Sequence, residues 1–150
     1  MIELRSVSKV YDGVAVVDDV TLTLERGTLT AVVGTSGSGK STLLRMVNRL
    51  VEPTSGQVLI DGADTAGIAA PELRRKIGYV IQDHGLFPHW TAARNIGTVP
   101  VLLGWRREDV NSRVRELMEM LQLDPDVIGP RFPHELSGGQ AQRVGVARAL

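Results

Sequence analysis

The stretch "GTSGSGKST", Gly34 to Thr42, constrains this chain most, because its pattern requires a strand, a tight loop and a helix in that order. It fits G-x-x-x-x-G-K-[ST] and lies between a short apolar run and a segment with helical spacing. Gly34, Gly37 and Gly39 allow the backbone to curl until successive N–H groups point inward. We therefore predict a loop that binds an anion.

The residue types in this loop point to a nucleoside triphosphate. A helix that starts near Lys40 adds the positive end of its dipole, the Lys40 side chain reaches the β- and γ-phosphates, and the Ser41 hydroxyl ligates Mg²⁺. A flexible glycine-serine turn is the alternative, and the strand and helix expected on either side disfavour it. The predicted nucleotide-binding residues of the loop are Gly34, Thr35, Ser36, Gly37, Ser38, Gly39, Lys40, Ser41 and Thr42.

The first part of the chain has the pattern of strands. Ile2 to Tyr11 and Val14 to Leu24 alternate apolar and polar residues around Asp12-Gly13, which predicts a β-hairpin. "LTAVVG", Leu29 to Gly34, is continuously apolar and is typical of a strand buried on both faces of a parallel sheet. Two further strands are expected at Gln57 to Ile60 and at Ile77 to Gln82.

Helical patterns surround and follow these strands. Leu43, Leu44, Val47 and Leu50 have helical spacing after the loop, and Pro71 suits the first turn of a short helix over 71–77. Residues 91–105 and 107–123 also read as helical, the second with Val110, Val114, Leu117 and Leu121 on one face. Strands thus cluster before residue 83 and helices after it, so we predict an α/β protein.

Composition excludes several classes of protein. The net charge is zero over 150 residues, which argues against a nucleic-acid binder, and the absence of cysteine excludes disulfides and thiolate metal sites. No apolar run approaches the roughly 18 residues that span a bilayer, and "MIELRSVSKVYDG" does not fit a signal peptide. We expect a protein that works inside a cell and that depends on another protein if it acts at a membrane.

The three histidines invite a metal-site interpretation that their spacing disfavours. No pair among His84, His89 and His134 has the helical spacing of metal ligands. We interpret His134 as a structural or interface residue.

A second anion-binding feature lies in "LSGGQAQRVGVARAL", Leu136 to Leu150. Ser137 with Gln140 three residues later forms the pattern of a capping box, and Gly138 and Gly139 leave the first-turn N–H groups uncovered. Such a helix start binds an anion through its N–H groups, its dipole and the serine hydroxyl. An ordinary capped helix is the alternative.

This stretch strongly resembles the signature motif of ABC-type ATPases, and Leu136 to Gln140 matches the core of that motif letter for letter. Tyr11, Gln82 and the helix-rich stretch between Gln82 and Ser137 agree with the family in order and spacing. The resemblance implies a P-loop NTPase fold of the ABC ATPase type, with an N-terminal antiparallel β subdomain, a partial RecA-like parallel-sheet core and an α-helical subdomain. It implies the β subdomain and P-loop core at 1–82 and the helical subdomain at 83–150.

The resemblance also implies roles for single residues. Tyr11 would stack on adenine, unless it is only a core aromatic of the hairpin. Gln82 would contact Mg²⁺ or the attacking water, and it shares the catalytic role with Lys40. Two subunits would pair head to tail, each ATP lying between the phosphate loop of one subunit and the signature of the other. The signature residues acting in trans are Leu136, Ser137, Gly138, Gly139 and Gln140.

A finer resemblance lies in Gly78 to Trp105, which is similar to the ATPase subunits of bacterial importers for glycine betaine, carnitine, choline and related osmoprotectants. It implies an ATP-binding subunit at the cytoplasmic face of the inner membrane, with transmembrane permease subunits as partners and, indirectly, a solute-binding protein. Phe87, Trp90 and Arg94 are candidates for the docking surface, unless they only pack the helical subdomain. The transported solute is not encoded in this chain.

Part of the family pattern is missing from the 150 residues. In the family, an apolar strand after the signature ends in Asp-Glu. The Asp holds Mg²⁺, and the Glu polarises the attacking water. A later histidine contacts the γ-phosphate. Asp18-Asp19 and Asp61 come too early in the chain for these roles. We therefore expect the N-terminal part of a longer subunit, truncated before the Walker B strand, that hydrolyses ATP hardly at all by itself. A soluble ABC-type ATPase and a non-hydrolysing nucleotide-binding module are the alternatives.

Overall fold

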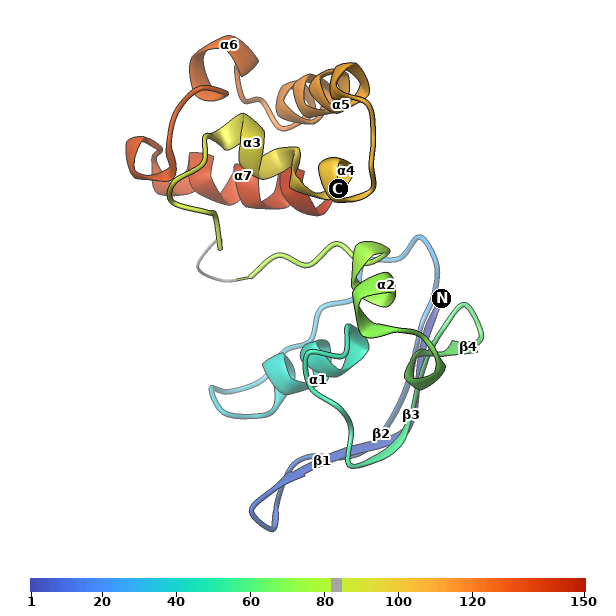
Figure 1. Ribbon diagram of the computed structural model, residues 1–150. Helices are drawn as coiled ribbons and strands as arrows, with labels where there is room; N and C mark the ends of the chain where they lie inside the picture. Colours follow the sequence, from blue (N-terminus) through green and yellow to red (C-terminus); the bar gives the residue numbers. More distant parts are fainter. Residues whose placement is uncertain (82–84) are drawn as a thin grey trace. The chain divides into compact units, whose positions relative to one another are not determined.

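A computed structural model describes residues 1–81 and 85–150, which form two compact units, Met1–Lys76 and Ile77–Leu150 (Figure 1). The sequence placed a boundary between subdomains after Gln82, and that assignment stays a prediction. Each unit has its own hydrophobic core.

The first unit contains a four-stranded antiparallel sheet with the order β2-β1-β3-β4. The predicted hairpin is confirmed, because β1 and β2 flank Asp12 and Gly13, whose positive φ angles of 49° and 80° suit the twist of a two-residue turn. The strands are β1 Ile2–Tyr11, β2 Val14–Leu24, β3 Ser55–Ile60 and β4 Ala63–Asp64.

The core of the first unit lies between this sheet and helix α1, Lys40–Val47. Strict alternation would place Leu4 and Ser6 on one face of β1, but a register shift between Leu4 and Val7 brings Val7 inward instead. The buried members of this core are Leu4, Val7, Val17, Met46 and Val58.

The helix predicted after the loop is confirmed as α1, but the four apolar residues at helical spacing differ in burial. Leu43 and Val47 pack against the core, but Met46 is its fully buried member, while Leu44 and Leu50 are about half exposed. Leu50 lies beyond the helix, which ends at Val47, so helical spacing no longer determines its direction.

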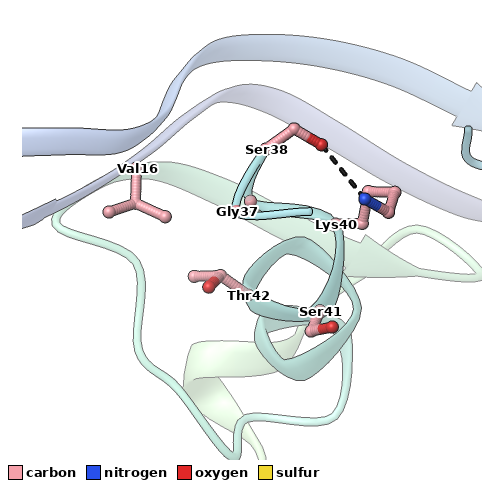
Figure 2. A pocket seen from close by; sticks show the side chains of 7 residues that line it. Val16, Gly37, Ser38, Lys40, Ser41 and Thr42 are labelled. Carbon is pink, nitrogen blue, oxygen red and sulfur yellow. Dashed lines mark hydrogen bonds between the residues drawn. The ribbon is translucent and has the colours of Figure 1, made fainter. Parts of the chain in front are cut away.

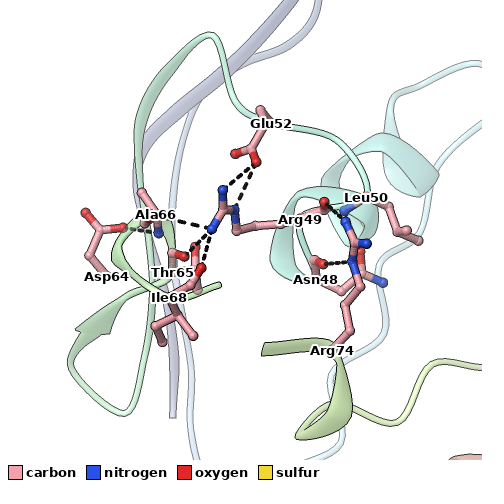
Figure 3. Close-up of polar contacts among 9 residues, drawn as sticks. All are labelled: Asn48, Arg49, Leu50, Glu52, Asp64, Thr65, Ala66, Ile68 and Arg74. Carbon is pink, nitrogen blue, oxygen red and sulfur yellow. Dashed lines mark hydrogen bonds and ion pairs between the residues drawn. The ribbon is translucent and has the colours of Figure 1, made fainter. Parts of the chain in front are cut away.

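Two arginines tie the end of α1 to the segment that follows β4 (Figure 3). Arg49 pairs with Glu52 and donates to the carbonyl oxygens of Thr65 at 2.9 Å and Ile68 at 2.6 Å. Arg74 donates to the carbonyl oxygens of Asn48 and Arg49. The Arg74 guanidinium complements the negative end of the α1 dipole, because it donates to carbonyl oxygens just beyond the last turn. This segment comprises the 3₁₀ turn η1 Thr65–Gly67 and α2 Ala70–Arg75, which matches the helix predicted at Pro71.

The two predicted strands of a parallel core are not formed. Leu29 to Gly34 and Ile77 to Ile81 have no strand conformation, and Leu29 is 100% exposed. A buried parallel strand needs hydrogen-bonded neighbours on its edges. Within residues 1–81 and 85–150 the only sheet is the antiparallel one, so neither run has a strand to pair with and their apolar side chains stay uncovered.

The second unit consists of helices around a separate core. The predicted face of α5 is confirmed, with Val110, Val114 and Leu117 buried and Leu121 packed at the edge of the core. The helical stretch expected over 91–105 is divided at Gly97, which is buried against α5. The elements are α3 Ala92–Ile96, α4 Thr98–Leu102, α5 Arg107–Met120, α6 Pro125–Ile128, η2 Pro133–Glu135 and α7 Gly138–Ala149.

Candidate functional site

A pocket of about 220 Å³ lies at the start of α1 (Figure 2). Six of its lining residues belong to the predicted phosphate loop, and the seventh comes from β2. The lining residues are Val16, Gly37, Ser38, Gly39, Lys40, Ser41 and Thr42. The structure therefore gathers the second half of the predicted loop around one cavity.

The loop follows its path because two glycines allow close approaches, and the one at Gly39 accepts no other residue. Gly39 has a φ of 82°, and a Cβ atom there would collide with the carbonyl oxygen of Val16. A Cβ atom at Gly34 would lie 2.7 Å from Oγ of Ser38. The loop thus packs its backbone directly on β2 and on itself.

The Lys40 ammonium lies inside the loop. Its Nζ donates to the carbonyl oxygens of Gly34 at 2.9 Å and Thr35 at 2.6 Å. It also donates to the hydroxyl of Ser38 at 3.2 Å, the bond drawn in Figure 2. Three oxygens thus satisfy the three N–H donors of the ammonium. The loop therefore holds a positive charge among the residues that line the pocket.

The first turn of α1 is open to a ligand. Gly39 caps the helix in the left-handed conformation, and no side chain in the described part of the chain bonds to the first-turn N–H groups from the cap position. The Ser41 hydroxyl belongs to an exposed residue of this turn. Free N–H groups and the helix dipole are features that suit this end of α1 to an anion.

The two remaining residues predicted to contact the nucleotide or the metal have different outcomes. Tyr11 ends β1 and is 44% exposed, and the Nζ of Lys9 lies 4.9 Å from the centre of its ring. This exposure is unlike that of a core aromatic in the hairpin. Gln82 lies outside the described residues.

The predicted capping box at the signature is confirmed. The N–H of Gln140 donates to Oγ of Ser137 at 3.3 Å, and Oε1 of Gln140 accepts from the N–H of Ser137 at 2.9 Å. Ser137, Gly138 and Gly139 are exposed, and a Cβ atom at either glycine would meet nothing within 4 Å among the described residues. Leu136 packs against the helical core. The start of α7 thus faces outward with its backbone accessible.

The residues suggested for docking form an aromatic cluster. The rings of Phe87 and Trp90 lie 4.5 Å apart, and the Arg94 guanidinium lies 4.4 Å above the Trp90 ring. The side chain of Asn95 is fully buried behind this loop and bonds to the backbone of Phe87, Trp90 and Thr91. Asn95 therefore fixes the shape of the loop.

The described histidines belong to aromatic contacts. His89 meets Phe87 and Trp90 edge to face, and His134 stacks on Phe132 with ring centres 5.9 Å apart. His84 lies outside the described residues. Among residues 1–81 and 85–150, no cluster of three or more His, Asp and Glu side chains forms a metal site.

Two residues of these candidate sites could not be named from the sequence motifs. Val16 lines the pocket only because β2 passes beside Gly39, and no local pattern reveals that contact. Asn95 offers a signal, since it lies between the buried residues Ala92 and Ile96 of α3, and a polar side chain on a buried face requires partners.

A glycine-rich loop opening a helix, with a lysine inside it, defines a phosphate-loop protein. Comparison with known families narrows this class. The chain belongs to the ABC transporter family, whose family model matches residues 17–150.

The curated relatives are ATP-binding proteins of bacterial uptake systems. The chain is 50% identical over its whole length to the glycine betaine uptake system ATP-binding protein YehX of Escherichia coli (strain K12), of which it covers 48%. It is 49% identical to the glycine betaine/carnitine/choline transport ATP-binding protein OpuCA of Bacillus subtilis (strain 168), of which it covers 40%. The chain thus spans about half the length, or less, of these relatives.

Solved structures share the fold. The ATP-binding cassette MJ0796, a dimer bound to ADP and Pi in a post-hydrolysis state, is 36% identical to the chain with a TM-score of 0.88. The match covers 100% of the chain and 69% of the cassette. The ABC ATPase fold is therefore confirmed, although neither Leu29 to Gly34 nor the described part of the second expected strand, Ile77 to Ile81, forms a parallel strand here. Within the described residues, no helix combines the length and the hydrophobicity needed to cross a bilayer.

Proposed function

We propose that this chain is the nucleotide-binding part of an ABC importer ATPase and that it takes part in two ATP sites at once. One observation carries the proposal. The same chain has a cationic phosphate loop around Lys40 and a second, outward-facing helix start at Ser137 whose glycines are uncovered. Two anion-binding helix starts on one chain suit a nucleotide shared between two subunits.

The phosphate loop would bind ATP by exchanging its internal contacts for phosphate oxygens. Lys40 would release the carbonyl oxygens of Gly34 and Thr35 and bind the β- and γ-phosphates instead. The open first turn of α1 would add N–H donors and its dipole. Tyr11 would stack on adenine, since its ring is exposed at the end of β1.

The donor set fits Mg²⁺ as a companion of the nucleotide. Mg²⁺ prefers six oxygen ligands and commonly keeps several waters, so the Ser41 hydroxyl and phosphate oxygens suffice as the first ligands. When bound, the cation would neutralise charge that develops on the transferred phosphoryl group. Lys40 would hold the γ-phosphate, and Gln82 would orient the attacking water.

The signature would act on the nucleotide of a second subunit. Ser137, Gly138 and Gly139 present a hydroxyl and uncovered backbone, while Leu136 and Gln140 hold this turn in place through the core and the capping box. Such a head-to-tail dimer would close on ATP and open after hydrolysis, because the γ-phosphate binds both surfaces only in the closed state.

The subunit would act peripherally at the cytoplasmic face of the membrane, docked on transmembrane permease subunits. The cluster of Phe87, Trp90 and Arg94 offers a rigid aromatic surface of the kind enriched at interfaces. The names of the relatives YehX and OpuCA support an osmoprotectant or quaternary amine, delivered by a solute-binding protein, as the imported solute.

Nucleotide binding is the first requirement of the proposal and can be tested directly. We expect a fluorescent ATP analogue to bind the chain with Mg²⁺ present, and Lys40→Ala to weaken that binding by about 100-fold or more, as the loss of a charged contact to phosphate implies. Lys76→Ala is the matched control, because Lys76 is exposed and pairs only with Glu72 among the described residues. Equal binding by all three proteins would contradict the proposal.

Uptake tests the solute class. In proteoliposomes that contain the assembled importer, labelled glycine betaine or choline should enter only when ATP is present on the side of the ATP-binding subunits. Uptake of an unrelated solute, with neither of these transported, would overturn the assignment of the solute and leave the ATPase proposal standing.

A further inference from the structure

The last turn of α7 contacts the chain on both sides of Gln82. On one side, a Cβ atom at Gly78 would collide with the carbonyl oxygen of Ala149 and lie 2.9 Å from its carbonyl carbon, so the two backbones touch. On the other side, Nη1 of Arg148 donates to the carbonyl oxygen of Gly85 at 2.7 Å. Residues 82–84 themselves lie outside the described residues.

The contact at Gly85 is closely packed. Gly85 has a φ of 56°, and a Cβ atom there would lie 2.9 Å from Cγ1 of Ile81 and 3.5 Å from Nη2 of Arg148. Burial also lowers the pKa of Arg148, although the guanidinium stays charged. A charged donor that is partly removed from water forms a strong and directional hydrogen bond with a carbonyl oxygen.

The other end of the same helix carries the signature. Arg143 donates to the carbonyl oxygens of Leu121 at 3.2 Å and Gln122 at 3.1 Å, which fixes the first half of α7 to the end of α5. Val144 and Ala147 are buried in the helical core between the two arginines. Because α7 is held along its length, it is a rigid connection between Ser137 and the chain on either side of Gln82.

We propose that Arg148 is a positioning residue that ties the segment bearing Gln82 to the helix bearing the signature. Any movement of the signature turn toward a second subunit's nucleotide then moves Gly85, and a partner that displaces the aromatic loop starting at Phe87 moves α7. This inference rests on the proposed function and deepens it, since it assigns a route between the docking surface and the nucleotide.

Amide hydrogen exchange on the chain tests the contact without nucleotide. Arg148→Met keeps the apolar stem and removes the donors, so we expect exchange at residues 85–90 to accelerate by about tenfold or more, as the loss of a charged hydrogen bond implies. Arg143→Met is the matched control on the same helix, and it should accelerate exchange near Leu121 and Gln122 instead. Unchanged protection of residues 85–90, or the same pattern in both variants, would overturn the proposal.

Arg148→Lys keeps the test valid if the methionine variant does not fold. Lysine retains one charged donor of similar reach, so exchange at residues 85–90 should fall between that of the parent and that of an unprotected loop. Protection equal to that of the parent, together with an unchanged turnover rate in the next measurement, would contradict a role for the guanidinium.

The ATPase kinetics of the assembled importer test whether this contact affects turnover. The phosphate loop lies outside this contact, so Arg148→Met or Arg148→Lys should leave KM for ATP nearly unchanged and lower kcat, by about tenfold for the methionine variant. Arg107→Met, on an exposed residue of α5, should change neither constant. A raised KM with parental kcat, or no change in either, would refute the inference. A parent importer that hydrolyses no ATP would instead refute the proposed function.

Discussion

At the scale of single residues, the site depends on close approaches that only certain side chains permit. Gly39 combines a left-handed backbone with direct packing on the carbonyl of Val16, and the loop reaches β2 for that reason. Asn95 is fully buried, yet each of its polar atoms finds a backbone partner in the loop it supports. Each residue therefore gives a specific prediction about stability.

Alanine substitutions at Gly39 and Gly27 should separate the cost of a left-handed backbone from the cost of a steric collision. We expect Gly39→Ala to lower the free energy of unfolding of the first unit by about 2 kcal/mol or more and to abolish nucleotide binding, because the left-handed conformation and the collision with Val16 act together. Gly27→Ala shares the positive φ, 75°, but has open space around it, and should cost only about 1 kcal/mol. Urea unfolding followed by circular dichroism measures both, and equal losses would contradict this account.

Removal of the buried amide should destabilise the docking loop. Asn95→Ala leaves the N–H of Phe87 and the carbonyl oxygen of Trp90 without their side-chain partner, at an expected cost of about 2–4 kcal/mol. Trp90 fluorescence and urea unfolding report the change. Asn111→Ala, on an exposed position of α5, is the control and should cost less than about 0.5 kcal/mol. A similar loss in both variants would show that the hydrogen bonds of Asn95 do not stabilise the loop.

At the scale of elements, the sequence was a good guide wherever a local signal fixes the structure. Asp12-Gly13 specifies the hairpin, Ser137 and Gln140 specify the start of α7, and the apolar spacing of α5 specifies its buried face. The failures concern Leu29 to Gly34 and Ile77 to Ile81, whose strand conformation depends on neighbouring strands rather than on local preference. The contacts of Arg148 and Val16 were equally invisible, because they join segments distant in sequence.

The capping box allows the stability of α7 to be separated from its binding role. Aspartate is as good an N-cap as serine, so Ser137→Asp should leave the urea midpoint of the second unit nearly unchanged. The added negative charge should, however, prevent nucleotide-dependent association of two chains, since it repels the phosphates that this turn is proposed to bind. Ser137→Ala should instead lower the stability of the second unit by about 1 kcal/mol and affect the association of two chains less than Ser137→Asp does. Association by Ser137→Asp at the parental level would argue against the binding role.

At the scale of the whole molecule, exposed ion pairs in both units are expected to contribute to the response to acid. Hydrogen bonds from the N-terminal ammonium of Met1, from Lys76 and from Arg115 lower the pKa values of Asp61, Glu72 and Asp126, respectively. A lowered pKa contributes stability above the ordinary values of 3.8 for Asp and 4.5 for Glu, and that stability is lost as the pH falls through the lowered values.

The urea midpoint should therefore decrease as the pH falls below about 4.5, and added salt should weaken the decrease because the pairs are exposed. In the triple variant Asp61→Asn, Glu72→Gln and Asp126→Asn, the urea midpoint should depend less steeply on pH between about pH 5 and about pH 3. An equally steep dependence in the variant would show that other carboxyl groups control the acid response.

The central claim, that Ser137–Gly139 of one chain complete the nucleotide site of another, is tested most directly by mixing two defective variants. Lys40→Ala destroys the phosphate loop and keeps the signature, while Ser137→Arg keeps the loop and blocks the signature. Neither variant alone should dimerise with a non-hydrolysable ATP analogue in analytical ultracentrifugation. Their mixture should form a heterodimer, because it contains one intact composite site. Dimerisation by Ser137→Arg alone, or no heterodimer in a mixture whose parent chain dimerises, would contradict the account.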